Sequence, residues 1–140
     1  MVPINYFAVI LSAIAAMGLG FLWYGPLFGK QWASLMGWSA QEAAAKMKTD
    51  MRVTYATQLV GALLMAYVLA NSIIFMGAYL NITGISAGLQ AAIWSWLGFV
   101  APVTVGSVLW DGKPWKLWVL NAGYFLVLLV IMGLILGYWV

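Results

Sequence analysis

The amino-acid sequence predicts an all-α integral membrane protein, with four transmembrane helices in an up-down-up-down bundle. Three observations predict this fold class. Of the 140 residues, 66% are hydrophobic and only 6% are charged, whereas a soluble domain has about 25% charged residues. Four apolar runs are each long enough to cross a bilayer, and every charged side chain lies outside them. A surface so poor in charge is suited to lipid rather than to water.

The positions of the four spans follow from the apolar runs and from the turns that interrupt them. A spanning helix needs about 20 predominantly apolar residues. Gly25-Pro26, Asn81-Ile82-Thr83-Gly84 and Asp111-Gly112-Lys113-Pro114 supply the turn residues. We therefore expect one membrane domain, residues 1–140. Its predicted spans are residues 4–24, 53–76, 87–109 and 117–139, and its long loop is residues 25–52.

The long loop has predicted structure of its own. Ser39-Ala40-Gln41-Glu42 matches a capping box, which predicts a short helix continuing to about Lys48. Before it, the apolar side chains between Leu27 and Met36 favour an amphipathic segment in the plane of the membrane interface. This segment is either a connector or a regulatory or partner-binding element.

The charge distribution predicts orientation. All Lys and Arg residues lie in the first and third loops, which an up-down bundle places on one side. The positive-inside rule makes that side cytoplasmic. We expect a multi-pass protein of the bacterial cytoplasmic (inner) membrane with both termini outside, in the periplasm. Tryptophans near the span ends predict an aromatic belt, and the expected cytoplasmic interface comprises Trp23, Lys30, Trp32, Arg52, Lys113 and Lys116.

Absent residue types limit the chemistry that the chain can perform. The sequence contains no cysteine and no histidine, so we expect no zinc site, no haem bound through His and no iron–sulfur cluster. The predicted spans contain no charged residue, which argues against an ion pump. The acids Glu42, Asp50 and Asp111 form no evident pair. We expect no enzyme activity, no catalytic residue, no metal ligand and no nucleic-acid partner.

Polar and aromatic residues inside the predicted spans are candidate site residues. Gln58, Thr104 and Asn121 lie at a similar depth, and Tyr124 follows Asn121 by one helical turn. They predict a polar cluster that either joins the helices by hydrogen bonds or binds a ligand. Pro102 frees the carbonyl of Gly98 and predicts a kink in the third span.

Two tryptophans lie too deep in the third predicted span for an aromatic belt to explain them. These residues, Trp94 and Trp96, either pack against other helices or contact a lipid, a carotenoid or a quinone.

Small residues recur at helical spacing in three of the spans. In lipid, small residues allow the close backbone contact that holds helices together. They serve either packing within the bundle or an interface with other membrane subunits or with another copy of the chain. The residues are Ala8, Ser12, Ala16 and Gly20, then Ala62, Ala66 and Ala70, and finally Gly133 and Gly137.

Four segments of the chain form a recognisable set: Asn5-Tyr6, the run from Leu22 to Trp32, Trp96-Leu97-Gly98-Phe99 and Asn121-Ala122-Gly123-Tyr124. Together they resemble a bacterial family of small membrane proteins, domain-of-unknown-function family 1761. The most specific are the segment beginning Trp23-Tyr24-Gly25-Pro26 and the one from Asn121 to Tyr124. Family members often carry His directly after that Tyr, where this chain has Phe125. The resemblance implies the four-helix architecture, and it implies no established activity.

Two functions fit these observations. The first is a non-catalytic accessory or structural subunit of a larger respiratory or photosynthetic membrane complex, bound through apolar and aromatic helix faces. The alternative is a small homo-oligomeric carrier or channel for a neutral or lipophilic solute, which a weak repeat of the Leu-Trp-x-Gly pattern near residues 22–26 and 109–114 supports.

Overall fold

The computed structural model describes residues 2–140, which form helices joined by turns. Within these residues, four helical segments are long and apolar enough to cross a membrane: Tyr6–Leu27, Arg52–Leu80, Gly84–Leu109 and Trp115–Tyr138. The prediction of an all-α chain with four apolar segments of spanning length is therefore confirmed.

The first span consists of α1 (Tyr6–Leu22) and a π-helical turn, η1 (Trp23–Leu27). Helix α1 begins two residues after the predicted start, because Asn5 acts as its cap: the backbone N–H of Ala8 donates to the Asn5 Oδ1 at 3.2 Å. Such a bond satisfies an amide that would otherwise lack a partner at the start of the helix.

The long loop contains α2 (Gly29–Leu35) and α3 (Ala40–Met47). The predicted capping box is present at α3. The backbone N–H of Glu42 donates to the Ser39 Oγ at 3.1 Å, and the backbone N–H of Ser39 donates to the Glu42 Oε2 at 2.9 Å. The predicted short helix after Ser39 is therefore confirmed.

Helix α4 (Arg52–Leu80) is longer than the sequence indicated. It has 29 residues, which at 1.5 Å per residue amount to roughly 44 Å, compared with a hydrocarbon core of about 30 Å. It passes the expected end at Met76 and stops at Asn81, whose φ of 56° is left-handed. A helix of this length must tilt or extend beyond the hydrocarbon region.

The third span is divided, whereas the fourth is continuous. Pro102 lies just after a π-helical turn in which the Ala101 N–H donates to the Trp96 carbonyl, five residues back. The regular helical hydrogen bonding is thus interrupted where Pro102 predicted a kink. The pieces are α5 (Gly84–Ser95), η2 (Trp96–Val100), α6 (Ala101–Thr104) and α7 (Gly106–Leu109), followed by α8 (Trp115–Tyr138).

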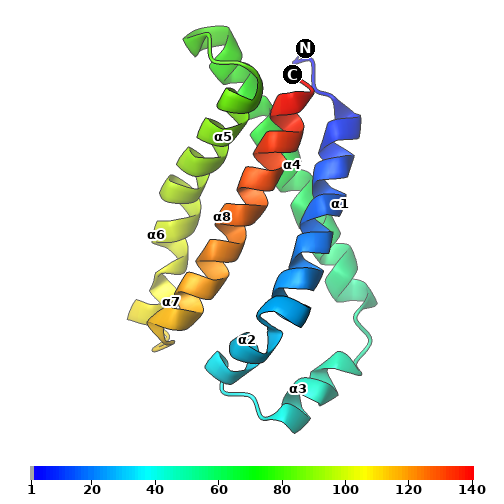
Figure 1. The fold of residues 1–140 in the computed structure, drawn as a ribbon, viewed down its shortest axis with the longest axis vertical. Helices are drawn as coiled ribbons and strands as arrows, with labels where there is room; N and C mark the ends of the chain where they lie inside the picture. Colours follow the sequence, from blue (N-terminus) through cyan, green and yellow to red (C-terminus); the bar gives the residue numbers. More distant parts are fainter. Residues whose placement is uncertain (1) are drawn as a thin grey trace.

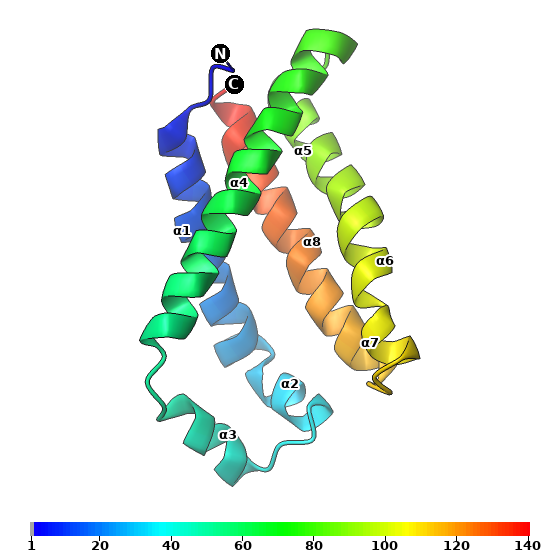
Figure 2. The ribbon, with the colours of Figure 1, turned by 180° about the vertical axis from the view of Figure 1, so that it is seen from behind.

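The helices converge at one end of the molecule and spread at the other. The two termini lie at the narrow end, and α2, α3 and α7 lie at the broad end (Figure 1). Figure 2 shows α4 diverging from α6 and α7 toward that broad end. Residues 52–60 of α4 are all exposed, whereas Ala66 and Ile73 further along it are fully buried. The core is therefore closed near the termini and open near α2 and α3.

Small residues line the closed part of the core. Helix α1 packs against α4, and the small residues predicted to pack helices are buried there: Ala8, Ser12, Ala16, Ala62, Ala66 and Ala70. Gly20 lies against α8, since a Cβ on it would be 3.0 Å from the Tyr124 hydroxyl oxygen. These stripes therefore lie at contacts within the chain.

Helices α5 and α8 share the most extensive contact of the fold. A Cβ added to Gly88 would overlap the carbonyl oxygen of Gly133, and one added to Gly137 would lie 2.6 Å from the carbonyl oxygen of Gly84. Gly133 and Gly137 thus meet a second pair of glycines, Gly84 and Gly88, which the sequence reading missed. Backbones this close leave no room for a methyl group.

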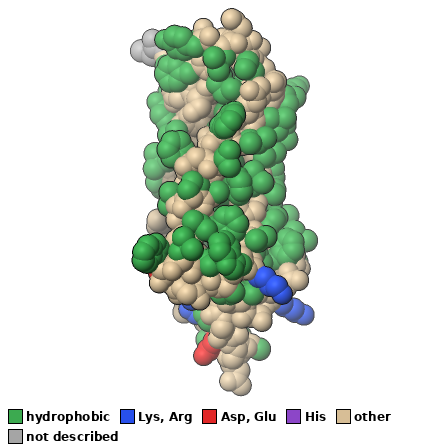
Figure 3. Space-filling view, turned by 90° about the vertical axis from the view of Figure 1, so that its left-hand side faces the viewer, with side chains coloured by type: hydrophobic (Ala, Val, Ile, Leu, Met, Phe, Trp, Pro, Cys, Tyr) green, Lys and Arg blue, Asp and Glu red, His purple; other side chains and the backbone are tan. Residues whose placement is uncertain are grey.

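Charged side chains occupy the broad end. On the face drawn in Figure 3, blue and red side chains lie near the lower end, and apolar side chains cover the length above them. Arg52 forms an exposed ion pair with Asp50, Nε to Oδ1 at 3.4 Å. The side chains that the sequence grouped in two loops thus share one end of the structure.

Candidate functional site

The open end of the bundle contains a cavity of about 1050 Å³. Residues from α1, η1, α2, α4, α6, α7 and α8 line it, together with Met47 of α3 and Met51. Most of the wall is apolar and aromatic. The aromatic lining residues are Phe21, Tyr24, Trp32, Tyr55, Trp110, Trp118, Tyr124 and Phe125. A large apolar cavity with a few polar groups is typical of a small-molecule binding site.

All four residues of the predicted polar cluster line this cavity: Gln58, Thr104, Asn121 and Tyr124. Within residues 2–140, however, no hydrogen bond joins two of these side chains, and Asn121 and Thr104 bond to other groups. The Tyr24 hydroxyl donates to the Asn121 Oδ1 at 2.8 Å, and the Trp118 Nε1 donates to the Thr104 Oγ1 at 3.1 Å. The structure thus brings the four residues to one cavity, and it pairs Asn121 and Thr104 with partners that the sequence did not predict.

The turn at the end of the first span positions Tyr24. Pro26 has no N–H, so the regular helix cannot continue through it. Gly25 adopts the non-helical angles φ −114° and ψ −106°. Gly29 lies against the backbone of Tyr24, since a Cβ on Gly29 would be 2.7 Å from the Tyr24 carbonyl oxygen. Glycine and proline thus shape the turn from which Tyr24 reaches α8.

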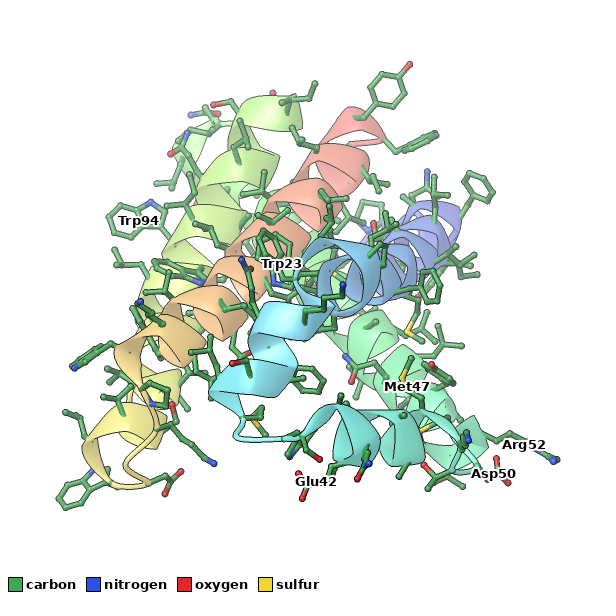
Figure 4. The ribbon with its side chains drawn as sticks, turned by 60° about the horizontal axis from the view of Figure 1, so that its bottom comes forward. Trp23, Glu42, Met47, Asp50, Arg52 and Trp94 are labelled. Atoms are coloured by element: carbon green, nitrogen blue, oxygen red, sulfur yellow. The ribbon has the colours of Figure 1, made fainter. Side chains whose placement is uncertain are left out.

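Two indole groups reach the backbone of α8 from different elements. The Trp23 Nε1 donates to the carbonyl oxygen of Leu120 at 3.2 Å, and the Trp96 Nε1 donates to that of Ala122 at 2.7 Å. Figure 4 shows Trp23 beside α8, between the first and fourth spans. These bonds satisfy both indoles and hold η1 and η2 against the segment of α8 that carries Asn121.

The two deep tryptophans, predicted either to pack against other helices or to contact a lipid, a carotenoid or a quinone, have different surroundings. Trp96 is partly buried against the core, whereas the Trp94 side chain is 65% exposed and points away from the bundle (Figure 4). Neither residue lines the cavity. The structure therefore does not bring them together as one contact surface.

Aromatic rings connect the cavity wall to the long loop. The ring centroids of Tyr124 and Tyr24 are 5.0 Å apart, those of Tyr24 and Trp32 are 5.1 Å apart, and those of Trp32 and Trp38 are 4.9 Å apart. All three contacts are edge-to-face, which is a favoured arrangement. The ammonium group of Lys46 lies 4.3 Å from the Trp38 ring centroid, so α3 is connected to α8 through this row.

The predicted cytoplasmic interface residues divide into two groups. Trp23 and Trp32 pack inward, at α8 and at the cavity. The charged residues lie at the surface of the broad end: Lys30, Arg52, Lys113 and Lys116. Lys30 and Lys116 line a separate hollow between α2 and α8.

The cavity lining carries little charge and several neutral polar groups. Among residues 2–140, Asp111 is the one charged residue that lines it. Within residues 2–140, no three His, Cys, Asp or Glu side chains lie in a group that could hold a metal ion. Further polar lining comes from hydroxyl and amide groups on Thr54, Gln58, Thr104, Ser107 and Asn121, from the tyrosine hydroxyls and from the indole N–H groups. Such groups give and accept hydrogen bonds without charge.

Comparison with known proteins identifies one family. The family described as "Protein of unknown function (DUF1761)" matches residues 7–137. No curated protein and no solved structure matches the chain. The two segments that carry the resemblance most specifically, from Trp23 and from Asn121 to Tyr124, meet at the cavity wall.

Proposed function

The chain belongs to the DUF1761 family of proteins of unknown function, and from the cavity in its own structure we propose that it binds a neutral, lipophilic solute as a small membrane carrier or channel. The observation that supports this function is the cavity of about 1050 Å³ at the open end of the bundle. Ligand pockets for small molecules range from about 300 to 1,000 Å³, so the space suits a molecule of substantial size.

The lining favours a neutral ligand with a long apolar part. A charged ligand would lose its hydration in the cavity and would find no opposite charge there except, for a cation, that of Asp111. The lining therefore favours neutral or weakly polar molecules. Four methionines, Met17, Met36, Met47 and Met51, contribute flexible apolar surface. Methionine adapts its shape to irregular ligands.

Hydrogen-bonding groups on α4 and α8 would hold the polar end of such a ligand. The Oδ1 of Asn121 accepts a bond from Tyr24, which leaves the amide N–H groups of Asn121 as donors. Gln58 supplies a second amide on the opposite wall. A carbonyl, hydroxyl or quinone-type oxygen matches these groups.

Photocrosslinking tests the proposal. Purified protein in lipid nanodiscs is irradiated with a long-chain fatty alcohol that carries a diazirine, and the labelled peptides are identified by mass spectrometry. We expect labelling of the peptides around Asn121 and Gln58. Ser107→Trp should fill the cavity and remove most of that labelling, because Ser107 lines the wall.

A matched variant controls for the added indole. Phe99→Trp places it on the same span at a side chain that is 79% exposed, and it should leave cavity labelling unchanged. Labelling of the outward-facing peptide around Trp94 reports contact with bulk lipid in every variant. Equal labelling around Asn121 in the wild type and in Ser107→Trp contradicts the binding proposal.

The same proposal includes a membrane orientation. The four spans run up-down-up-down through the bacterial cytoplasmic membrane, with the charged broad end in the cytoplasm and both termini in the periplasm. The gathering of Lys and Arg at the end opposite the termini supports this orientation (Figures 1 and 3). The cavity then opens in the cytoplasmic half of the bilayer.

A second candidate is the non-catalytic accessory subunit of a larger complex. The outward face of the third span supports it, because Trp94, Leu97 and Phe99 are all large, apolar and more than half exposed. Native electrophoresis of untagged membranes separates the two candidates. Migration with a large complex favours the subunit, whereas a discrete homo-oligomer favours the carrier.

A further inference from the structure

A second hollow, of about 550 Å³, lies between α2 and α8. It is lined by Lys30, Gln31, Ser34 and Leu35 of α2 and by Lys116 and Leu120 of α8. It shares no lining residue with the larger cavity. What it binds is therefore a separate question from the ligand of the larger cavity.

The hollow carries positive charge without a compensating carboxylate. Lys30 and Lys116 are its two charged residues. The acids of the chain are engaged or placed elsewhere: Asp50 pairs with Arg52, Glu42 caps α3, and Asp111 lines the larger cavity. Within residues 2–140, neither lysine forms a salt bridge. An anion would thus meet two ammonium groups with no competing acid among the lining residues.

The two lysines lie at the same boundary of the apolar region. Lys30 follows the segment Tyr6–Leu27 by three residues, and Lys116 is the second residue of Trp115–Tyr138. Lipid phosphates occupy this level of a bilayer, at the edge of the hydrocarbon core. The hydroxyl of Ser34 and the amide of Gln31 add hydrogen-bond donors beside the charges.

The hollow also has an apolar wall and a fixed frame. Leu35 and Leu120 line it beside the lysines. The carbonyl of Leu120 accepts the Trp23 indole N–H, and the close turn at Gly29 sets where α2 begins. Charge, donors and apolar surface are therefore held together, as a lipid with a phosphate group above an acyl chain requires.

We propose that this hollow binds an anionic phospholipid of the leaflet at the broad end, with the lipid phosphate between Lys30 and Lys116 and the start of an acyl chain on Leu35 and Leu120. A free phosphate presents the same oxygens but has no apolar part. It would leave the exposed part of Leu35 uncovered.

Native mass spectrometry tests the proposal. Detergent-purified protein is titrated with phosphatidylglycerol, and the first binding event is quantified. An interfacial Lys contributes about fivefold to binding of an anionic lipid, so the double variant Lys30→Gln/Lys116→Gln should weaken that event by about 25-fold. Both side chains are exposed, and an unchanged melting temperature verifies the fold of the variant.

A matched pair separates this site from general electrostatic attraction. Lys48→Gln/Lys113→Gln removes the same charge from exposed lysines outside the hollow and should leave the first binding event unchanged. Equal weakening by both pairs overturns the proposal. So does equal binding of phosphatidylcholine, or competition by inorganic phosphate alone at lipid concentrations. Because no residue is shared with the larger cavity, these results are independent of the photocrosslinking outcome.

Discussion

At the scale of single residues, the bond from Tyr24 to Asn121 joins the first span to the fourth. Both side chains line the cavity, and the hydroxyl and amide oxygens are 2.8 Å apart. Inside a membrane, water does not compete readily for such groups, although measured interhelical bonds average about 0.6 kcal/mol and reach about 1.7 kcal/mol. The bond is therefore a modest stabiliser and an important positioning contact.

Tyr24→Phe should lower the free energy of unfolding by about 1 kcal/mol, because the Asn121 oxygen loses its donor. Thermal unfolding in a mild detergent measures the effect. Tyr79→Phe removes a hydroxyl from a side chain that lies exposed on α4, so it should change nothing. Equal effects of the two variants would show that the bond does not form.

A second pair of variants distinguishes the two deep tryptophans. Trp96→Phe removes the donor to the Ala122 carbonyl and should destabilise the protein by about 1 kcal/mol. Trp94→Phe alters a side chain that points away from the bundle and should leave the melting temperature unchanged. If Trp94→Phe instead destabilises the isolated protein as much as Trp96→Phe does, Trp94 is a packing residue.

At the scale of elements, the contact between α5 and α8 depends on glycine. Gly88→Ala should force the two backbones apart, because the added Cβ would overlap the carbonyl oxygen of Gly133. Overpacking costs typically 1–3 kcal/mol, and we expect about 3 kcal/mol here because backbone rather than side chain must move. Unfolding by denaturant in detergent micelles measures it.

Gly61→Ala provides the control for the glycine prediction. Gly61 lies within α4, and a Cβ on it would meet nothing within 4 Å. In soluble peptides and proteins, alanine is about 1 kcal/mol more favourable than glycine within a helix. Gly61→Ala should therefore be neutral or stabilising. A neutral Gly88→Ala would mean that the two helices are further apart than the structure has them.

Much at this scale was predictable from sequence, and the exceptions have physical reasons. The four apolar segments and the cap at Ser39 follow from composition and from local hydrogen bonding, which neighbouring residues decide. The end of α4 was predicted too early, at Met76, because hydropathy marks where an apolar run weakens and not where the left-handed Asn81 ends the helix. The pairing of Gly84 with Gly137 required knowing which helices are neighbours. Short-range patterns carry no such information.

The candidate site was likewise predictable from the sequence only in part. Gln58, Thr104, Asn121 and Tyr124 could be grouped from their depth, since polar residues inside a span are few. Their partners could not, because Tyr24 reaches α8 only through the turn at Gly25. Trp118 lies near a predicted span end, where position alone indicates an aromatic belt, yet its indole N–H donates to Thr104 across from α8 to α6. The depth of a polar residue within its span could be predicted from the sequence, whereas the direction and partner of its side chain could not.

At the scale of the whole molecule, orientation is directly testable because the chain has no cysteine. Thr83→Cys places one thiol in the exposed turn between α4 and α5, and Gln41→Cys places one on exposed α3. A membrane-impermeant maleimide should label Thr83→Cys in intact spheroplasts and Gln41→Cys only after permeabilisation. The reverse pattern would invert the proposed topology.

The divergence of α4 from α6 and α7 also has a mechanical consequence. A chain that is narrow at one end and broad at the other displaces unequal areas in the two leaflets. Drawing α4 toward α7 would reduce the area at the broad end and shrink the space between them. Compression of that leaflet would therefore favour a conformation with a smaller cavity, and stretching would favour the open conformation described here, because work against lateral pressure shifts populations. Membrane tension would thereby act on the volume offered to a ligand.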